Sequence, residues 1–162
     1  MNIRRILPLS LGVLMSLAAG GQTTTIITST LSQTSGPLGL GSTETLRVDL
    51  TNVATTIAAT TSAATTASCT GTVSFLNASG AAIGTAIPFT VASGVTFPVN
   101  LAFMNAGFTG NRGELRVVIA LTRTPGVPCQ LETSISTFDT SSGATHLYVA
   151  GPSLLAIFPL VR

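Results

Sequence analysis

Lysine and tryptophan are absent from this chain, and histidine and tyrosine each occur once. Charged residues make up 7% of the sequence, whereas about a quarter is typical of globular domains. Nucleic acids and anionic membrane surfaces are recognised by clustered positive charge, so we expect this chain to bind neither. The single histidine, His146, excludes metal sites built on two or more histidines. The scarcity of aromatic side chains argues against a lectin that stacks sugars on exposed rings.

The N-terminal segment has the three parts of a secretory signal peptide. Two arginines give a basic start, residues 6–19 form an apolar run, and residues 18–21 supply the small side chains that a signal peptidase requires. The run is shorter than the roughly 20 apolar residues that a membrane-spanning helix needs. We therefore predict a signal peptide over residues 1–21 with cleavage near Gly20–Gln22. The mature chain is then secreted, periplasmic or held at the cell surface, with no membrane span.

Cleavage would also change the charge of the protein. It removes two of the seven arginines and leaves five arginines against five carboxylates, so the mature side chains sum to zero. A low net charge gives little repulsion between copies of a protein. Self-association or an unknown protein partner is therefore expected, and no cofactor is.

The two cysteines, Cys69 and Cys129, both lie in the predicted mature chain. Export permits a disulfide between them. The two positions are 60 residues apart, and a bridge that closes a loop of that length is expected to stabilise a fold by roughly 4 kcal/mol. The alternative is a pair of buried free thiols.

Apolar and polar residues alternate along seven segments, which is the period of β-strands. These segments cover residues 46–50, 69–75, 87–91, 95–101, 114–121, 129–136 and 147–149. Short clusters of glycine, proline, asparagine and serine separate them, as chain reversals require. One apolar and one hydroxyl-rich or charged face per strand is typical of antiparallel sheets. We predict an all-β fold, an antiparallel immunoglobulin-like β-sandwich of seven or eight strands.

The predicted organisation after the signal peptide is an N-terminal strand and linker at residues 22–43, followed by the sandwich at residues 44–162. Pro88 and Pro98 interrupt two predicted strands. Because proline cannot donate to a ladder, these strands are expected at sheet edges or at bulges.

Two segments lack this alternation. Residues 54–68 are a low-complexity run of alanine and threonine, and threonine disfavours a helix there, so we predict a long mobile loop. Residues 154–161 are strongly apolar but too short to cross a bilayer. We expect a last strand or a packed tail.

A catalytic constellation is hard to assemble from these residues. A Ser-His-Asp triad would have to use His146, with Asp139 as a candidate acid, but no Gly-x-Ser-x-Gly elbow occurs. We therefore expect His146 on the solvent face of the last strand. Several other charged residues alternate with apolar ones and are expected to form cross-strand ion pairs; they are Arg47, Asp49, Glu114, Arg116 and Glu132. We predict no catalytic, cofactor-binding or metal-ligating residue.

Three segments carry a resemblance to a known group of proteins. They are Cys69–Leu76 with the turn Asn77–Gly80, then Arg112–Val118, then Cys129–Thr140. Together they resemble uncharacterised secreted bacterial proteins of the immunoglobulin-like β-sandwich type. This resemblance implies a fold and an extracellular setting but no activity.

The leading hypothesis is a secreted, non-enzymatic sandwich that serves as a structural or interaction module. An alternative is a pilin-like filament subunit, because the size, the cysteine pair and the Thr/Ala/Gly/Ser bias resemble subunits assembled by strand addition. Residues 23–31 would then complete a neighbour's sheet, although pairing within their own domain is the favoured outcome. A second alternative is a secreted hydrolase of unrecognised type.

Overall fold

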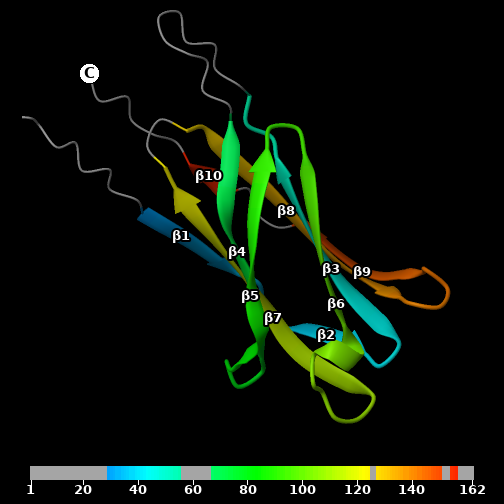
Figure 1. Cartoon of the computed structure of the whole chain (residues 1–162). Coiled ribbons are helices and arrows are strands. Elements are labelled where there is room, and N and C mark those ends of the chain that lie inside the picture. The colour runs from blue at the N-terminus through cyan, green and yellow to red at the C-terminus, as the bar shows by residue number, and fades with distance from the viewer. Residues whose placement is uncertain (1–28, 56–66, 125–126, 151–153, 157–162) are drawn as a thin grey trace, which may run out of the picture.

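Two antiparallel β-sheets pack face to face in the computed structural model, which describes residues 29–55, 67–124, 127–150 and 154–156 (Figure 1). The strands are β1 (Ser29–Thr34), β2 (Leu38–Gly41), β3 (Glu44–Asn52), β4 (Ser68–Asn77), β5 (Ala82–Ala92), β6 (Thr96–Ala102), β7 (Arg112–Arg123), β8 (Cys129–Asp139), β9 (Thr145–Ala150) and β10 (Leu154–Ala156). A short 3₁₀ turn, η1 (Phe103–Asn105), follows β6. The fold is therefore all-β, as predicted.

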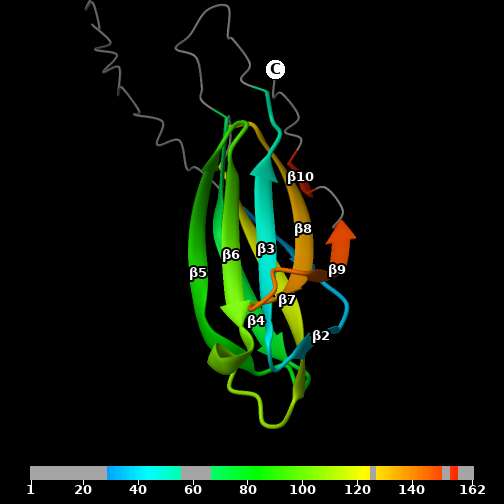
Figure 2. The ribbon, with the colours of Figure 1, turned by 90° about the vertical axis from the view of Figure 1, so that its right-hand side faces the viewer.

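The first sheet has the order β1-β7-β4-β5, and β2 continues beside β7 where β1 ends. The second sheet has the order β10-β8-β3-β6, and β9 likewise shares β8 with β10. Each sheet thus has one divided edge, so the ten strands of the described residues occupy eight positions. Figure 2 shows the layers from the side. The seven alternating segments fall on β3 to β9, in chain order, and only residue 95, one position before β6, lies outside these strands.

The alternation places apolar side chains between the sheets. Leu46, Val48 and Leu50 of β3 are fully buried, whereas Arg47 between them is exposed. Strand β7 follows the same rule, with Leu115, Val117, Ile119 and Leu121 buried. Since a period of two sends successive side chains to opposite faces, one face of each sheet builds the core and the other meets solvent.

The predicted disulfide is present. The Sγ atoms of Cys69 and Cys129 are bonded, and their Cα atoms lie 5.1 Å apart. Cys69 belongs to β4 and Cys129 begins β8, so the bond joins the two sheets. Both residues are buried.

The two prolines lie in edge strands, which confirms that prediction. Pro88 is in β5 and Pro98 is in β6, and each of these strands pairs on one side only. Strands β5 and β6 follow one another through a turn at Ser93–Gly94, so both prolines lie on the same lateral side of the sandwich. The divided edges, β1/β2 and β9/β10, form the opposite lateral side.

Strands β1 and β2 pair with β7 in the first sheet, so the described part of residues 22–43, which the sequence set apart as a strand and linker, contributes two strands to the sandwich. Leu154–Ala156 form a last strand beside β8, as one of the two expectations had it. The predicted signal peptide, the cleavage region and most of the loop over residues 54–68 lie outside the described residues. Among the described residues, no helix has the length and apolarity that crossing a membrane requires.

Candidate interaction surface

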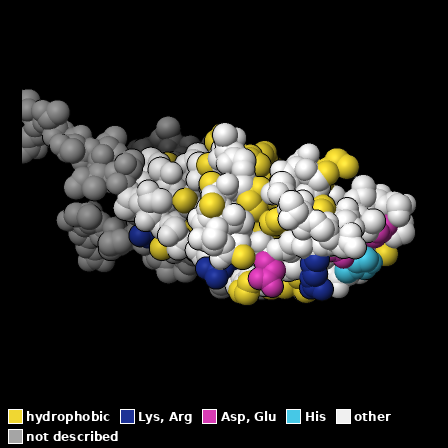
Figure 3. Space-filling view, turned by 90° about the horizontal axis from the view of Figure 1, so that it is seen from below, with side chains coloured by type: hydrophobic (Ala, Val, Ile, Leu, Met, Phe, Trp, Pro, Cys, Tyr) yellow, Lys and Arg dark blue, Asp and Glu magenta, His cyan; other side chains and the backbone are white. Residues whose placement is uncertain are grey.

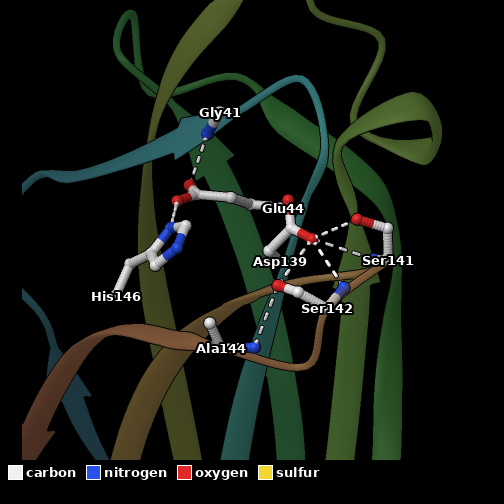
Figure 4. Close-up of polar contacts among 7 residues, drawn as sticks. All are labelled: Gly41, Glu44, Asp139, Ser141, Ser142, Ala144 and His146. Carbon is white, nitrogen blue, oxygen red and sulfur yellow. Dashed lines mark hydrogen bonds and ion pairs between the residues drawn. The ribbon is translucent and has the colours of Figure 1, made fainter.

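A polar cluster lies at the end of the sandwich where β2, β3 and β9 meet (Figure 4). The Glu44 carboxylate accepts a hydrogen bond from the backbone N–H of Gly41 at 2.7 Å through Oε2. Its other oxygen, Oε1, lies 2.5 Å from Nδ1 of His146. The Gly41 hydrogen bond, the His146 contact and the charge of Arg112 hold the pKa of Glu44 below its ordinary value. Glu44 therefore ties strand β2 of the first sheet to strand β9 of the second.

Asp139 organises the neighbouring turn and does not contact His146. Its Oδ1 accepts hydrogen bonds from the backbone N–H groups of Ser141 and Ser142, at 3.0 and 2.8 Å. The hydroxyls of the same two serines also donate to it (Figure 4). These donors lower the pKa of Asp139, with the Ser141 side chain contributing most. Asp139 thus stabilises the β8–β9 turn as an ionised carboxylate.

The cluster does not form a catalytic triad. The structure brings Glu44 to His146, whereas the sequence suggested Asp139 as its acid. No serine, threonine or cysteine among the described residues donates to the second ring nitrogen of His146. His146 is exposed on β9, as expected. The described residues also contain no group of three or more His, Cys, Asp or Glu side chains that could hold a metal ion.

The expected cross-strand ion pairs are not what the structure shows. Arg47 bonds Asp49 at 2.9 Å, two residues along the same strand β3. Glu132 lies on β8 in the second sheet, whereas Glu114 and Arg116 lie on β7 in the first. The prediction was wrong because alternation assigns a residue to a face but does not say which strands become neighbours.

Charge is distributed unevenly between central and edge strands. Every Asp, Glu and Arg that the structure describes lies on β3, β7 or β8; they are Glu44, Arg47, Asp49, Arg112, Glu114, Arg116, Arg123, Glu132 and Asp139. Each of these strands has a neighbour on both sides. The edge strands β1, β2, β5, β6, β9 and β10 carry none of them. On the face in Figure 3, charged side chains gather near one margin and uncharged surface covers the rest.

This distribution lacks one of the usual protections of sheet edges, which is charge. Natural proteins blunt exposed edges with charge, especially lysine, with proline, or with bulges. Here the lateral side formed by β5 and β6 carries Pro88 and Pro98, and the opposite side carries the divided edges. Composition alone indicated few charges, but only the strand order reveals that they avoid every described edge.

A groove of about 490 Å³ opens between the sheets on the side of the divided edges. Residues 33–38, at the junction of β1 and β2, line one wall, and Ile135 of β8 and Val149 of β9 line the other. Val149 is 40% exposed, and Oε1 of Gln33 is buried with no hydrogen-bond partner among the described residues. Among the described residues, the divided side therefore combines strands that pair on one side only with incompletely covered apolar surface.

Comparisons of the chain with protein-family models, with curated proteins and with solved structures find no significant match. On the side of β1, β2, β9 and β10, the described residues present two sheet edges without Asp, Glu or Arg and an apolar groove between them, and the polar cluster of Glu44 and His146 lies at one end of the sandwich.

Proposed function

We propose that this protein is an exported, non-enzymatic β-sandwich of immunoglobulin-like type that acts as a structural or interaction module and associates through its sheet edges. The observation that carries the proposal is the confinement of all described Asp, Glu and Arg residues to the central strands. An uncharged edge offers unpaired backbone groups to another strand without electrostatic repulsion.

Two features support the exported location. The N-terminal sequence has the basic, apolar and small-residue parts of a signal peptide. The Cys69–Cys129 disulfide is of a kind that persists in oxidising compartments and is rare in the cytosol.

The pairing of strand β1 within its own chain argues against the alternative of a pilin-like subunit that donates this strand to a neighbour. Ser29–Thr34 pair with residues 118–123 of β7 in the same chain, in an uninterrupted register. Exchange of this strand between copies would require that ladder to open first. Association of complete sandwiches through their edges keeps it closed and is the form that we propose. The hydrolase alternative has no supporting contact, since His146 lacks a nucleophile among the described residues.

Electron microscopy of the protein recovered after export, combined with light scattering, tests the proposal. We expect particles or filaments larger than one sandwich, and no turnover of ester, peptide or glycoside substrates. A uniform population of single sandwiches at every concentration, or turnover that is lost in a His146→Ala variant, would contradict it.

A further inference from the structure

We propose that β1 is the edge that associates, and that it pairs antiparallel with β1 of a second copy around a two-fold axis at Ser32. This inference rests on the proposed function and adds to it the strand, the partner and the register. The partner is another copy of this chain, and its β1 presents the same uncharged hydrogen-bonding row.

The direction of the backbone groups in β1 follows from one hydrogen bond. The N–H of Ser35 donates to the carbonyl of Val117 on β7 at 2.9 Å. In an antiparallel ladder, alternate residues direct both their N–H and C=O to the same neighbour. Residues of odd number in β1 therefore bond β7, and the even-numbered Thr30, Ser32 and Thr34 direct theirs away from it. All three of these residues are exposed.

Strand β1 is the described edge with the fewest obstacles to a partner. Its six residues contain no glycine, proline or charge, and its register with β7 has no shift. Strand β5 contains Pro88 and a glycine, Gly84, with a positive φ of 69°. Strand β6 contains Pro98, and the ladder of β9 shifts beside Phe138. Strands β2 and β10 are only four and three residues long.

A two-fold axis at Ser32, the middle residue of the outward row, pairs all three of its residues. If Ser32 faces Ser32 of the second copy, Thr30 faces Thr34 and Thr34 faces Thr30. Each such pair can exchange two backbone hydrogen bonds, so every outward group of the three residues finds a partner. The first sheets of the two copies then become one continuous sheet, and the closed symmetry limits this contact to a dimer.

The side chains of β1 fit this arrangement. Side chains directly opposite one another lie on the same face of a sheet. On the inner face, Leu31 of one copy would lie beside Gln33 of the other, next to the groove that Gln33 already lines. Leu31 is half-buried against the core in one copy, and a second sandwich would cover more of it. On the outer face, only serine and threonine hydroxyls would meet.

Proline substitutions can test whether association uses the β1 edge and not the β5 edge. The N–H of Ser32 points away from β7, so Ser32→Pro removes a donor to the second copy and none from its own ladder. The matched control is Thr90→Pro on β5. The N–H of Ser93 donates to Ala67 next to β4, so by the same alternation the N–H of Thr90, like the missing one of Pro88, points outward.

We expect light scattering to show that Ser32→Pro weakens dimerisation of the exported protein about tenfold or more, because it breaks two hydrogen bonds across the axis. Thr90→Pro is expected to dimerise like the unsubstituted protein. If Ser32→Pro dimerises equally well, the assignment to β1 is overturned while the proposed function stands. If the unsubstituted protein never associates, the proposed function fails as well.

A cysteine variant tests the register without depending on proline. Two Cα atoms in a hydrogen-bonded antiparallel pair lie about 5.5 Å apart, within the range that a disulfide spans. We expect Ser32→Cys to give a disulfide-linked dimer on a non-reducing gel and Thr90→Cys to give none. Equal or absent dimer in the two variants would overturn the two-fold pairing at Ser32.

Discussion

Cys69 and Cys129 join the two sheets at the start of β4 and the start of β8 by a disulfide between buried residues. The two positions are 60 residues apart in the sequence. The bond therefore closes a loop that contains β5, β6 and β7, and it constrains the unfolded chain over that length.

Replacing both cysteines by alanine is expected to lower the free energy of unfolding by about 2–5 kcal/mol, because the unfolded chain regains the entropy of the open loop. Urea denaturation of the exported protein measures this change. Reduction of the unsubstituted protein should give a loss of similar size. A change below about 0.5 kcal/mol, as neutral surface substitutions give, would show that the bond contributes no stability.

Asn52 is a second link between the sheets. It lies at the end of β3 and is fully buried. Its Nδ2 donates to the carbonyl of Val91 on β5 at 3.0 Å, and its Oδ1 accepts from the N–H of Ala54 at 3.0 Å. The amide thus links the end of β3 to β5 in the other sheet and satisfies the backbone N–H of Ala54, which follows β3.

Asn52→Ala is expected to destabilise the fold by about 1–3 kcal/mol, because it removes the hydrogen bond to Val91 and leaves the backbone N–H of Ala54 without its acceptor. The matched control is Asn100→Ala on β6, where the side chain is exposed and a change within about 0.5 kcal/mol is expected. Equal effects of the two substitutions in urea denaturation would contradict the role of Asn52.

The sequence predicted the strands well because each has one buried face. Leu46, Val48 and Leu50 fix the phase of β3 without knowledge of its neighbours. The same alternation continues to Asn52, which therefore occupies a core-facing position. A polar residue at such a position was a sequence signal that its side chain is buried and hydrogen-bonded. The order of the strands could not be predicted, since it depends on contacts between segments far apart in the chain.

In the polar cluster, too, the contacts between residues far apart in the sequence could not be predicted. The acid that contacts His146 is Glu44, which is 102 positions away in the sequence, whereas Asp139 is close in sequence but engages its own turn. Nearness in sequence favoured the wrong carboxylate. The register of β3 beside β8 brings Glu44 opposite Asp139 and hence close to the start of β9.

Acid is expected to destabilise the fold through Glu44 and Asp139. Hydrogen bonds hold both pKa values below the ordinary 4.5 and 3.8, so the folded state binds fewer protons than the unfolded state. Their stabilisation is present above those ordinary values and is lost as the pH falls through and below them. Asp139→Asn and Glu44→Gln should therefore reduce the fall in urea midpoint between neutral pH and about pH 3.

Glu132→Gln on the exposed face of β8 is the control for this acid dependence, because it removes a carboxylate that accepts no hydrogen bond among the described residues. Because Glu44 also faces His146 and Arg112, its variant is measured with and without added salt. If the urea midpoint depends on pH in the same way in all three variants, neither Glu44 nor Asp139 links stability to pH.

The central claim is that uncharged edges make this protein associate, and a comparison of two lysine variants tests it. One variant places a lysine at an exposed position on each of the four longer edge strands, β1, β5, β6 and β9: Thr30→Lys, Thr90→Lys, Asn100→Lys and Val149→Lys. The control places the same added charge on exposed positions outside the strands: Ala78→Lys, Met104→Lys, Thr109→Lys and Asn111→Lys.

Sedimentation velocity over a concentration series then compares both variants with the unsubstituted exported protein. We predict that the unsubstituted protein and the turn-lysine control form larger species as concentration rises, and that the edge-lysine variant stays monomeric because charge blocks strand pairing. A monomeric unsubstituted protein at every concentration, or an edge-lysine variant that associates as strongly as the control, would contradict the account.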